Sequence, residues 1–140
     1  MIKPFTGGCM CGAVRYECSA EPIMSFNCHC RDCQRATGGA YVPALIVRRD
    51  AVTVTGELRY YNVHGDSGQI LSRGFCSTCG SRIFGKPDFK PELMAIMAGS
   101  LDDPTHHKPT MDIYTASAQT WDYMNPSLPK VPKAPQLPGT

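Results

Sequence analysis

Cysteine is the residue type in this sequence most able to support chemistry, with eight copies in 140 residues. Seven of them fall into three short motifs: C-x-C at Cys9 and Cys11, C-x-C-x-x-C at Cys28, Cys30 and Cys33, and C-x-x-C at Cys76 and Cys79. Neighbours this close rarely form disulfides with each other, because a disulfide requires particular Cα separations and Cβ directions. Thiols at this spacing suit a tetrahedral metal ion such as zinc. The spacing therefore predicts bound metal rather than a disulfide framework.

The seven clustered thiols divide most simply into four and three. The C-x-x-C motif ending at Cys79 is followed by Gly80, which is typical of a zinc knuckle because glycine lets the backbone fold beneath the metal. The C-x-C motif ending at Cys11 is also followed by glycine and is the natural second pair. An alternative division gives the knuckle two thiols of the triplet and leaves Cys9 and Cys11 without a metal. In the favoured division a four-cysteine site is structural, and a three-cysteine site keeps one coordination position open for water or substrate.

A three-thiolate zinc is expected to accept a thiol as fourth ligand and to deprotonate it for attack on a small carbonyl carbon. His29 and Asp32 are the nearest candidates for the accompanying proton transfer. Arg31 and Arg35 are candidates for pairing with a substrate carboxylate. Each has a structural alternative. His29 would hydrogen-bond the backbone, Asp32 would cap a short helix, and the two arginines would form a solvated helix face.

Composition excludes several classes of partner. Fourteen Lys and Arg face twelve Asp and Glu, and the formal net charge of +2 falls to about −1 once two zinc ions bind seven thiolates. We therefore expect no nucleic-acid partner, and no basic stripe with interleaved aromatic residues is present. The longest apolar run, residues 41–47, is far shorter than the ~20 residues of a membrane span. The N-terminal residues have no apolar stretch of a secretory signal, so we expect a cytoplasmic location. The sequence carries no marker of oligomeric state.

Most of the chain has the pattern of short strands, which predicts a mostly β fold with one short helix. The expected strands span residues 13–18, 41–47, 52–55, 58–61, 69–75, 82–84, 93–98 and 111–115. Gly56 predicts a hairpin between the third and fourth of these strands, and Pro43 predicts that the second is weakened or lies at an edge. Residues 64–68 have a turn composition, and residues 31–37 have a helical pattern that ends at two glycines. Alternation with Val14 and Tyr16 predicts that the isolated Cys18 packs in the core.

The sequence divides into a zinc-binding domain, residues 1–125, and a proline-rich C-terminal tail, residues 126–140. Prolines recur every third residue in the tail, which is the repeat of a polyproline II helix. We expect an extended arm lying on the domain or a frayed end. The alternative is a ligand for a proline-binding groove.

Three motifs resemble the glutathione-dependent formaldehyde-activating family, which also includes centromere protein V. They are GCMCGAVRYE at residues 8–17, CHCRDCQRATGG at residues 28–39 and RGFCSTCGSRIF at residues 73–84. The segment from Asp112 to Trp121 is similar to the last strand of the family. The resemblance implies a β-tent fold of packed antiparallel sheets. It also implies a structural zinc on Cys9, Cys11, Cys76 and Cys79 and a catalytic zinc on Cys28, Cys30 and Cys33.

The resemblance further implies a carbon–sulfur lyase-type enzyme whose founding members join formaldehyde to glutathione. A small thiol such as glutathione is then the expected partner. Two other hypotheses remain open from the residues. One is a non-catalytic zinc-binding module that binds a protein partner, since fold alone does not establish catalysis. The other is thiol redox chemistry, with a cysteine of the triplet as nucleophile and Cys18 as resolving thiol.

Overall fold

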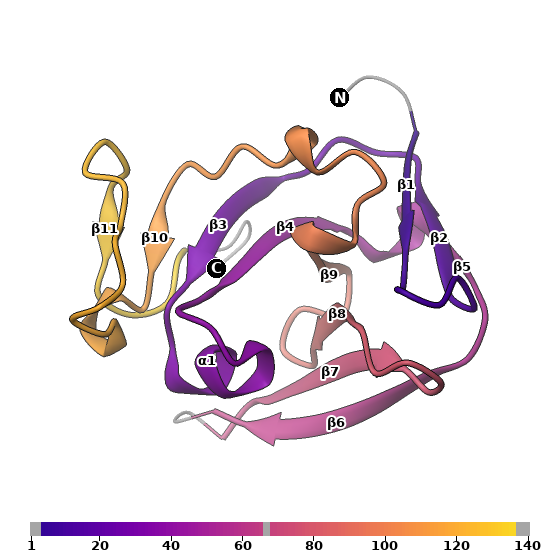
Figure 1. Cartoon of the computed structure of the whole chain (residues 1–140), viewed down its shortest axis with the longest axis horizontal. Coiled ribbons are helices and arrows are strands. Elements are labelled where there is room, and N and C mark those ends of the chain that lie inside the picture. Colours follow the sequence, from indigo (N-terminus) through magenta and orange to yellow (C-terminus); the bar gives the residue numbers. More distant parts are fainter. Residues whose placement is uncertain (1–3, 66–67, 137–140) are drawn as a thin grey trace.

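The computed structural model of the chain describes residues 4–65 and 68–136, which form two β-sheets (Figure 1). The smaller sheet has the strand order β1-β2-β5, with β1 at Phe5–Gly8, β2 at Arg15–Cys18 and β5 at Val52–Thr55. The larger sheet has the order β11-β10-β3-β4-β9-β8-β7-β6. Its strands are β3 (Met24–Cys28), β4 (Val42–Arg48), β6 (Leu58–His64), β7 (Ile70–Cys76), β8 (Arg82–Pro87), β9 (Leu93–Met97), β10 (Asp112–Ile113) and β11 (Lys130–Val131). Antiparallel pairing dominates both sheets, and β10 alone pairs in parallel, with β3 and with β11. The mostly β fold predicted from sequence is confirmed.

The α-helix of the described residues is α1, Arg31–Thr37, as predicted. It begins after Cys30, whose sulfur accepts the Cys33 amide, and ends at Gly38, whose φ of 73° closes the last turn. Short 3₁₀ turns occur at Arg49–Ala51, Ala98–Ser100, Pro104–His106 and Thr115–Ser117. Within the described ranges, no helix has the length and apolarity needed to cross a membrane.

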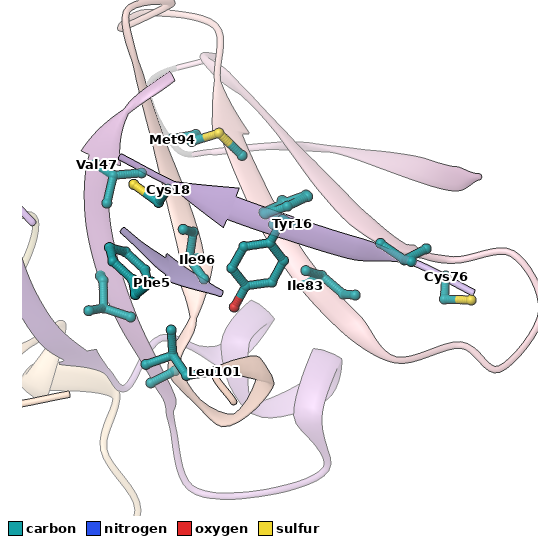
Figure 2. Packing of buried hydrophobic residues seen from close by; sticks show 13 residues of the cluster. Phe5, Tyr16, Cys18, Val47, Cys76, Ile83, Met94, Ile96 and Leu101 are labelled. Atoms are coloured by element: carbon teal, nitrogen blue, oxygen red, sulfur yellow. The ribbon is translucent and has the colours of Figure 1, made fainter. Parts of the chain in front are cut away.

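The main hydrophobic core lies between the two sheets (Figure 2). The alternation of β2 turns Tyr16 and Cys18 inward, so the prediction that Cys18 is a core residue is confirmed. The Tyr16 ring meets Phe84 of β8 edge to face at 5.3 Å between centroids. Ile83 and Ile96 are fully buried beside them. Complete burial of an aromatic side chain such as Phe84 contributes about 1.5–3 kcal/mol.

A second hydrophobic cluster lies on the part of the larger sheet that carries α1. It includes two cysteines of the triplet, Cys28 and Cys33, packed among apolar side chains. The other buried members are Phe26, Val42, Ala44, Ile46, Leu93 and Ile113. The triplet is therefore anchored in a packed core, and Cys18 belongs to the other cluster.

The predicted hairpin around Gly56 is wrong, although both of its strands exist. β5 pairs with β2 in the smaller sheet, whereas β6 pairs with β7 in the larger sheet. The prediction of an edge position for Pro43 is also wrong, because β4 lies between β3 and β9. Pairing with β9 begins only at Ala44, so the proline lies just beyond that ladder. Part of the predicted turn at 64–68, residues 66 and 67, lies outside the described residues. Strands β1, β3 and β11 were not predicted.

Gly56 carries the chain from one sheet to the other, and we expect Gly56→Ala to destabilise the protein by about 2 kcal/mol or more. Its φ is 96°, and an added Cβ would lie 2.0 Å from the backbone oxygen of Ala13. Chemical denaturation measures the loss. Gly99→Ala is the matched control, since a Cβ there meets nothing within 4 Å. Equal stability of the two variants would contradict the steric role of Gly56.

Residues 126–136 of the predicted tail run beside the domain. β11 pairs in parallel with β10, and the Asp112 amide bonds the Pro129 carbonyl at 3.0 Å. The Lys130 ammonium lies 2.9 Å from the Asp112 carboxylate. This segment therefore extends the larger sheet at its edge (Figure 1). Residues 137–140 of the tail lie outside the described part of the chain.

Candidate metal centres and adjoining groove

The four cysteines Cys9, Cys11, Cys76 and Cys79 converge on one point between the two sheets. Their sulfur atoms all lie within 4.8 Å of one another. Two of the separations are 3.6 Å, between Cys9 and Cys11, and 3.8 Å, between Cys11 and Cys76. Four sulfurs about 2.3 Å from a tetrahedral ion lie about 3.8 Å apart, so this group has the geometry of a closed metal site.

Amide and hydroxyl groups around this quartet favour thiolates. The Val14 amide donates to the Cys9 sulfur at 3.2 Å and lowers the pKa of that thiol. Hydrogen bonds from the Ser81 side chain and backbone lower the pKa of Cys79 to about 5. Gly12 and Gly80 follow the two motifs with φ of 82° and 78°, a backbone turn that glycine adopts without strain. The donor set therefore fits a structural metal ion.

The three cysteines Cys28, Cys30 and Cys33 form a second group, at the junction of β3 and α1. Their sulfurs also lie within 4.8 Å of one another. Cys28 ends β3, Cys30 precedes α1, and Cys33 lies in the first turn, with its amide 3.3 Å from the Cys30 sulfur. The seven clustered cysteines thus separate into four and three, and the alternative division is not what the structure shows. All eight cysteines are free.

Arg73 of β7 faces the triplet, and our reading of the sequence did not select it. Its two terminal nitrogens lie 3.7 and 3.8 Å from the Cys33 sulfur, and its side chain is buried. Burial alone would lower the pKa of Arg73, but the Cys33 and Cys30 thiolates and Asp32 raise it. The one available signal was a charged residue within an otherwise uncharged strand, three positions before Cys76. Arg73 thus supplies a fixed positive charge beside the triplet.

The three sulfurs divide charge unequally. Hydrogen bonds from Cys28 and Cys33 lower the pKa of Cys30. The hydrogen bonds with Cys30 and Cys33, together with burial, raise the pKa of Cys28. Three thiols that share charge in this way, two of them buried, lie beside a guanidinium and form a donor set that fits a metal ion with three protein ligands.

A groove of about 690 Å³ opens next to the triplet, between α1 and strands β6, β7 and β8. Asp32 and Arg35 line it from the helix, and Arg73 and Arg82 line it from the sheet. Tyr61 of β6 also contributes. The groove gives a small molecule access to the neighbourhood of Cys33.

The His29 side chain is buried between two carboxylates. One ring nitrogen lies 2.9 Å from an Asp112 oxygen, and the other lies 2.5 Å from an Asp122 oxygen. Both carboxylates are almost fully buried, and Lys130 pairs with the second oxygen of Asp112. His29 therefore joins the triplet loop to β10 and the C-terminal segment, and both of its ring nitrogens are occupied by these contacts.

The two arginines selected from the sequence lie in different settings. The Arg31 guanidinium donates to the Gln34 side chain, whereas Arg35 lines the groove. Gln34 in turn donates to the His29 carbonyl at 2.7 Å, which braces the triplet loop. Asp32 lies on the first turn and lines the groove, while the helix cap is Cys30.

These features define a small, mostly β protein with one closed and one open group of cysteines, the open group beside a groove. The sequence profile of the glutathione-dependent formaldehyde-activating enzyme family matches residues 4–117. The chain belongs to this family.

Relatives agree with that assignment. A Halomonas elongata protein, named provisionally as a glutathione-dependent formaldehyde-activating enzyme, is 31% identical over 108 residues, which cover 74% of this chain and 69% of the relative. A Penicillium rubens protein with the same provisional name is 26% identical over 155 residues, covering 89% and 80%. A crystal structure of a Rhodobacter sphaeroides protein matches with a TM-score of 0.54 and 26% identity, over 69% of this chain and 87% of that one.

Proposed function

We propose that this chain is a zinc-dependent, carbon–sulfur lyase-type enzyme that acts on the adduct of a small thiol, with glutathione and formaldehyde as the pair. The observation that carries the proposal is the open group Cys28, Cys30 and Cys33 beside a groove, in a chain of this family. The quartet would hold a structural zinc and the triplet a catalytic zinc. The chemistry needs reduced thiols, so the proposed location is the cytoplasm.

Zinc bound by the three thiolates would supply a site that lowers the pKa of an incoming thiol. The chain's own residues would hold the reactants around it. Arg73 fixes the Cys33 sulfur and offsets part of the negative charge of the triplet. Asp32 lines the groove and is the candidate for carrying a proton, while Arg35 is placed to pair with a substrate carboxylate. His29 and Arg31 are assigned to positioning, because their polar groups are bonded to Asp112, Asp122 and Gln34.

The reaction is balanced without any oxidant. The thiol sulfur forms a bond to the carbonyl carbon, and the carbonyl π bond breaks onto its oxygen. The thiol proton ends on that oxygen, which gives S-hydroxymethylglutathione. The reverse direction breaks the carbon–sulfur bond. The reaction therefore needs one group that binds the thiolate and one group that transfers its proton to the carbonyl oxygen.

Cobalt substitution tests the proposal. We expect glutathione to change the thiolate-to-cobalt absorption bands of the protein loaded with two cobalt ions. Cys33→Ser should abolish that change, while the bands of the quartet remain. Formaldehyde should then be consumed by the wild type in the presence of glutathione. Bands that do not respond to glutathione, in a protein with both sites filled, would instead favour the non-catalytic module that binds a protein partner.

A further inference from the structure

The groove beside the triplet carries an excess of positive charge. Three arginines line it, Arg35, Arg73 and Arg82, and Asp32 is the acidic residue among the described residues that line it. Asp32 and Arg35 are largely exposed on the helix. Arg73 and Arg82 instead lie at the bottom, on neighbouring strands β7 and β8. A ligand that fills this groove therefore meets two fixed guanidinium groups.

Within the described residues, neither of these arginines forms an ion pair with a carboxylate, although the terminal nitrogens of Arg73 contact the Cys33 sulfur. Arg73 is 8% exposed, and the buried Nε atoms of Arg73 and Arg82 have no hydrogen-bond partner among the described residues. Burial, followed by the nearby charge of Arg73, lowers the pKa of Arg82. Two partly desolvated cations on neighbouring strands repel each other, and an anion bound between them would reduce this repulsion. A carboxylate matches the planar, forked geometry of guanidinium.

Arg73 also connects this pair to the triplet. Its terminal nitrogens contact the Cys33 sulfur at 3.7 and 3.8 Å, and Arg82 also acts electrostatically on Cys33. We infer that Arg73 and Arg82 form a carboxylate-binding subsite, which makes the three-cysteine site selective for thiols that carry a carboxylate. This inference rests on the proposed function and names the chemical class of its substrate. The subsite would orient the thiol by its far end, while its sulfur points to Cys28, Cys30 and Cys33.

Matched thiols test the subsite. Glutathione and its diethyl ester have the same skeleton, and only the former carries carboxylates. Their affinities for the cobalt-substituted protein are measured from the thiolate-to-cobalt bands. We expect glutathione to bind the wild type at least about tenfold more tightly than the ester. Arg82→Gln should remove that preference without weakening the ester.

Arg48→Gln is the matched control, since Arg48 is exposed, pairs with Asp50 and lies outside the groove. It should keep the wild-type preference. Equal affinity of the two thiols for the wild type, or an unchanged preference in Arg82→Gln, would overturn the subsite and leave thiol binding at the triplet standing. If neither thiol alters the cobalt bands, the proposed function fails, and calorimetry with S-methylglutathione then tests the subsite by itself.

In that experiment, binding of S-methylglutathione that Arg82→Gln weakens about tenfold would support the subsite. No binding to the wild type would overturn the subsite.

Discussion

Cys79→Ser is expected to unfold the protein, whereas Cys33→Ser is expected to leave it folded with one zinc ion instead of two. Cys79 belongs to the quartet, which links the loop between β1 and β2 to the turn between β7 and β8. A structural zinc site is worth about 10–16 kcal/mol, more than the whole stability of many domains, which is about 5–15 kcal/mol. The open triplet lies on one short segment, residues 28–33, so its loss disconnects no distant elements.

Zinc content per chain and circular dichroism measure the two effects. Cys18→Ser is the matched control, because this cysteine is buried in the core between the sheets and belongs to neither group. It should keep two zinc ions at a modest cost in stability. The same zinc content and the same circular dichroism for Cys79→Ser and Cys33→Ser would show that the quartet and the triplet do not have separate structural and catalytic roles.

His29→Ala is expected to destabilise the protein by about 3–5 kcal/mol. The substitution leaves the Asp122 carboxylate, whose side chain is 1% exposed, without the ring that it bonds in the described structure. Asp112 keeps Lys130, so the penalty falls mainly on Asp122. Urea denaturation at neutral pH measures the change in the free energy of unfolding.

The milder variant Asp122→Asn separates stability from positioning. His29 lies between Cys28 and Cys30 in the sequence, so a less firmly held ring should lower the affinity of the triplet for cobalt by about tenfold and leave that of the quartet unchanged. His106→Ala is the control, because that histidine also faces an aspartate, Asp103, but both side chains are largely exposed. This substitution should lower the free energy of unfolding by less than about 1 kcal/mol. Equal losses of stability in His29→Ala and His106→Ala would contradict the stabilising role of the buried contacts of His29.

Local patterns were enough to predict several elements of this protein. α1 was predicted with its observed bounds, since its helical pattern and Gly38 are both encoded within a few residues. The burial of Cys18 followed from the alternation of β2. The division into four and three was favoured from the sequence because each of the two cysteine pairs is followed by a glycine and the triplet is not, and the structure groups the sulfurs in this way. The same motifs carried the resemblance to the family.

Strand pairing was not predictable in the same way. The pattern around Gly56 marks a reversal, but it does not say which strands lie on either side. Pairing is decided by the total burial of both sheets, to which residues far apart in sequence contribute. Pro43 shows the same limit, because its place inside the sheet depends on where the ladder with β9 begins.

The sequence by itself determined that Cys28, Cys30 and Cys33 lie together, because they belong to one short motif. It left open which thiols complete the other group, and the tertiary structure brought Cys9 and Cys11 to Cys76 and Cys79. The tertiary structure decided what surrounds them. It brought Arg73 and Arg82 to the groove from β7 and β8. It also placed the carboxylates of Asp112 and Asp122, which are 83 and 93 residues away in the sequence, against the two ring nitrogens of His29. Such partners meet only when distant strands pack together. A buried charge needs a partner because burial removes the water that would otherwise solvate it.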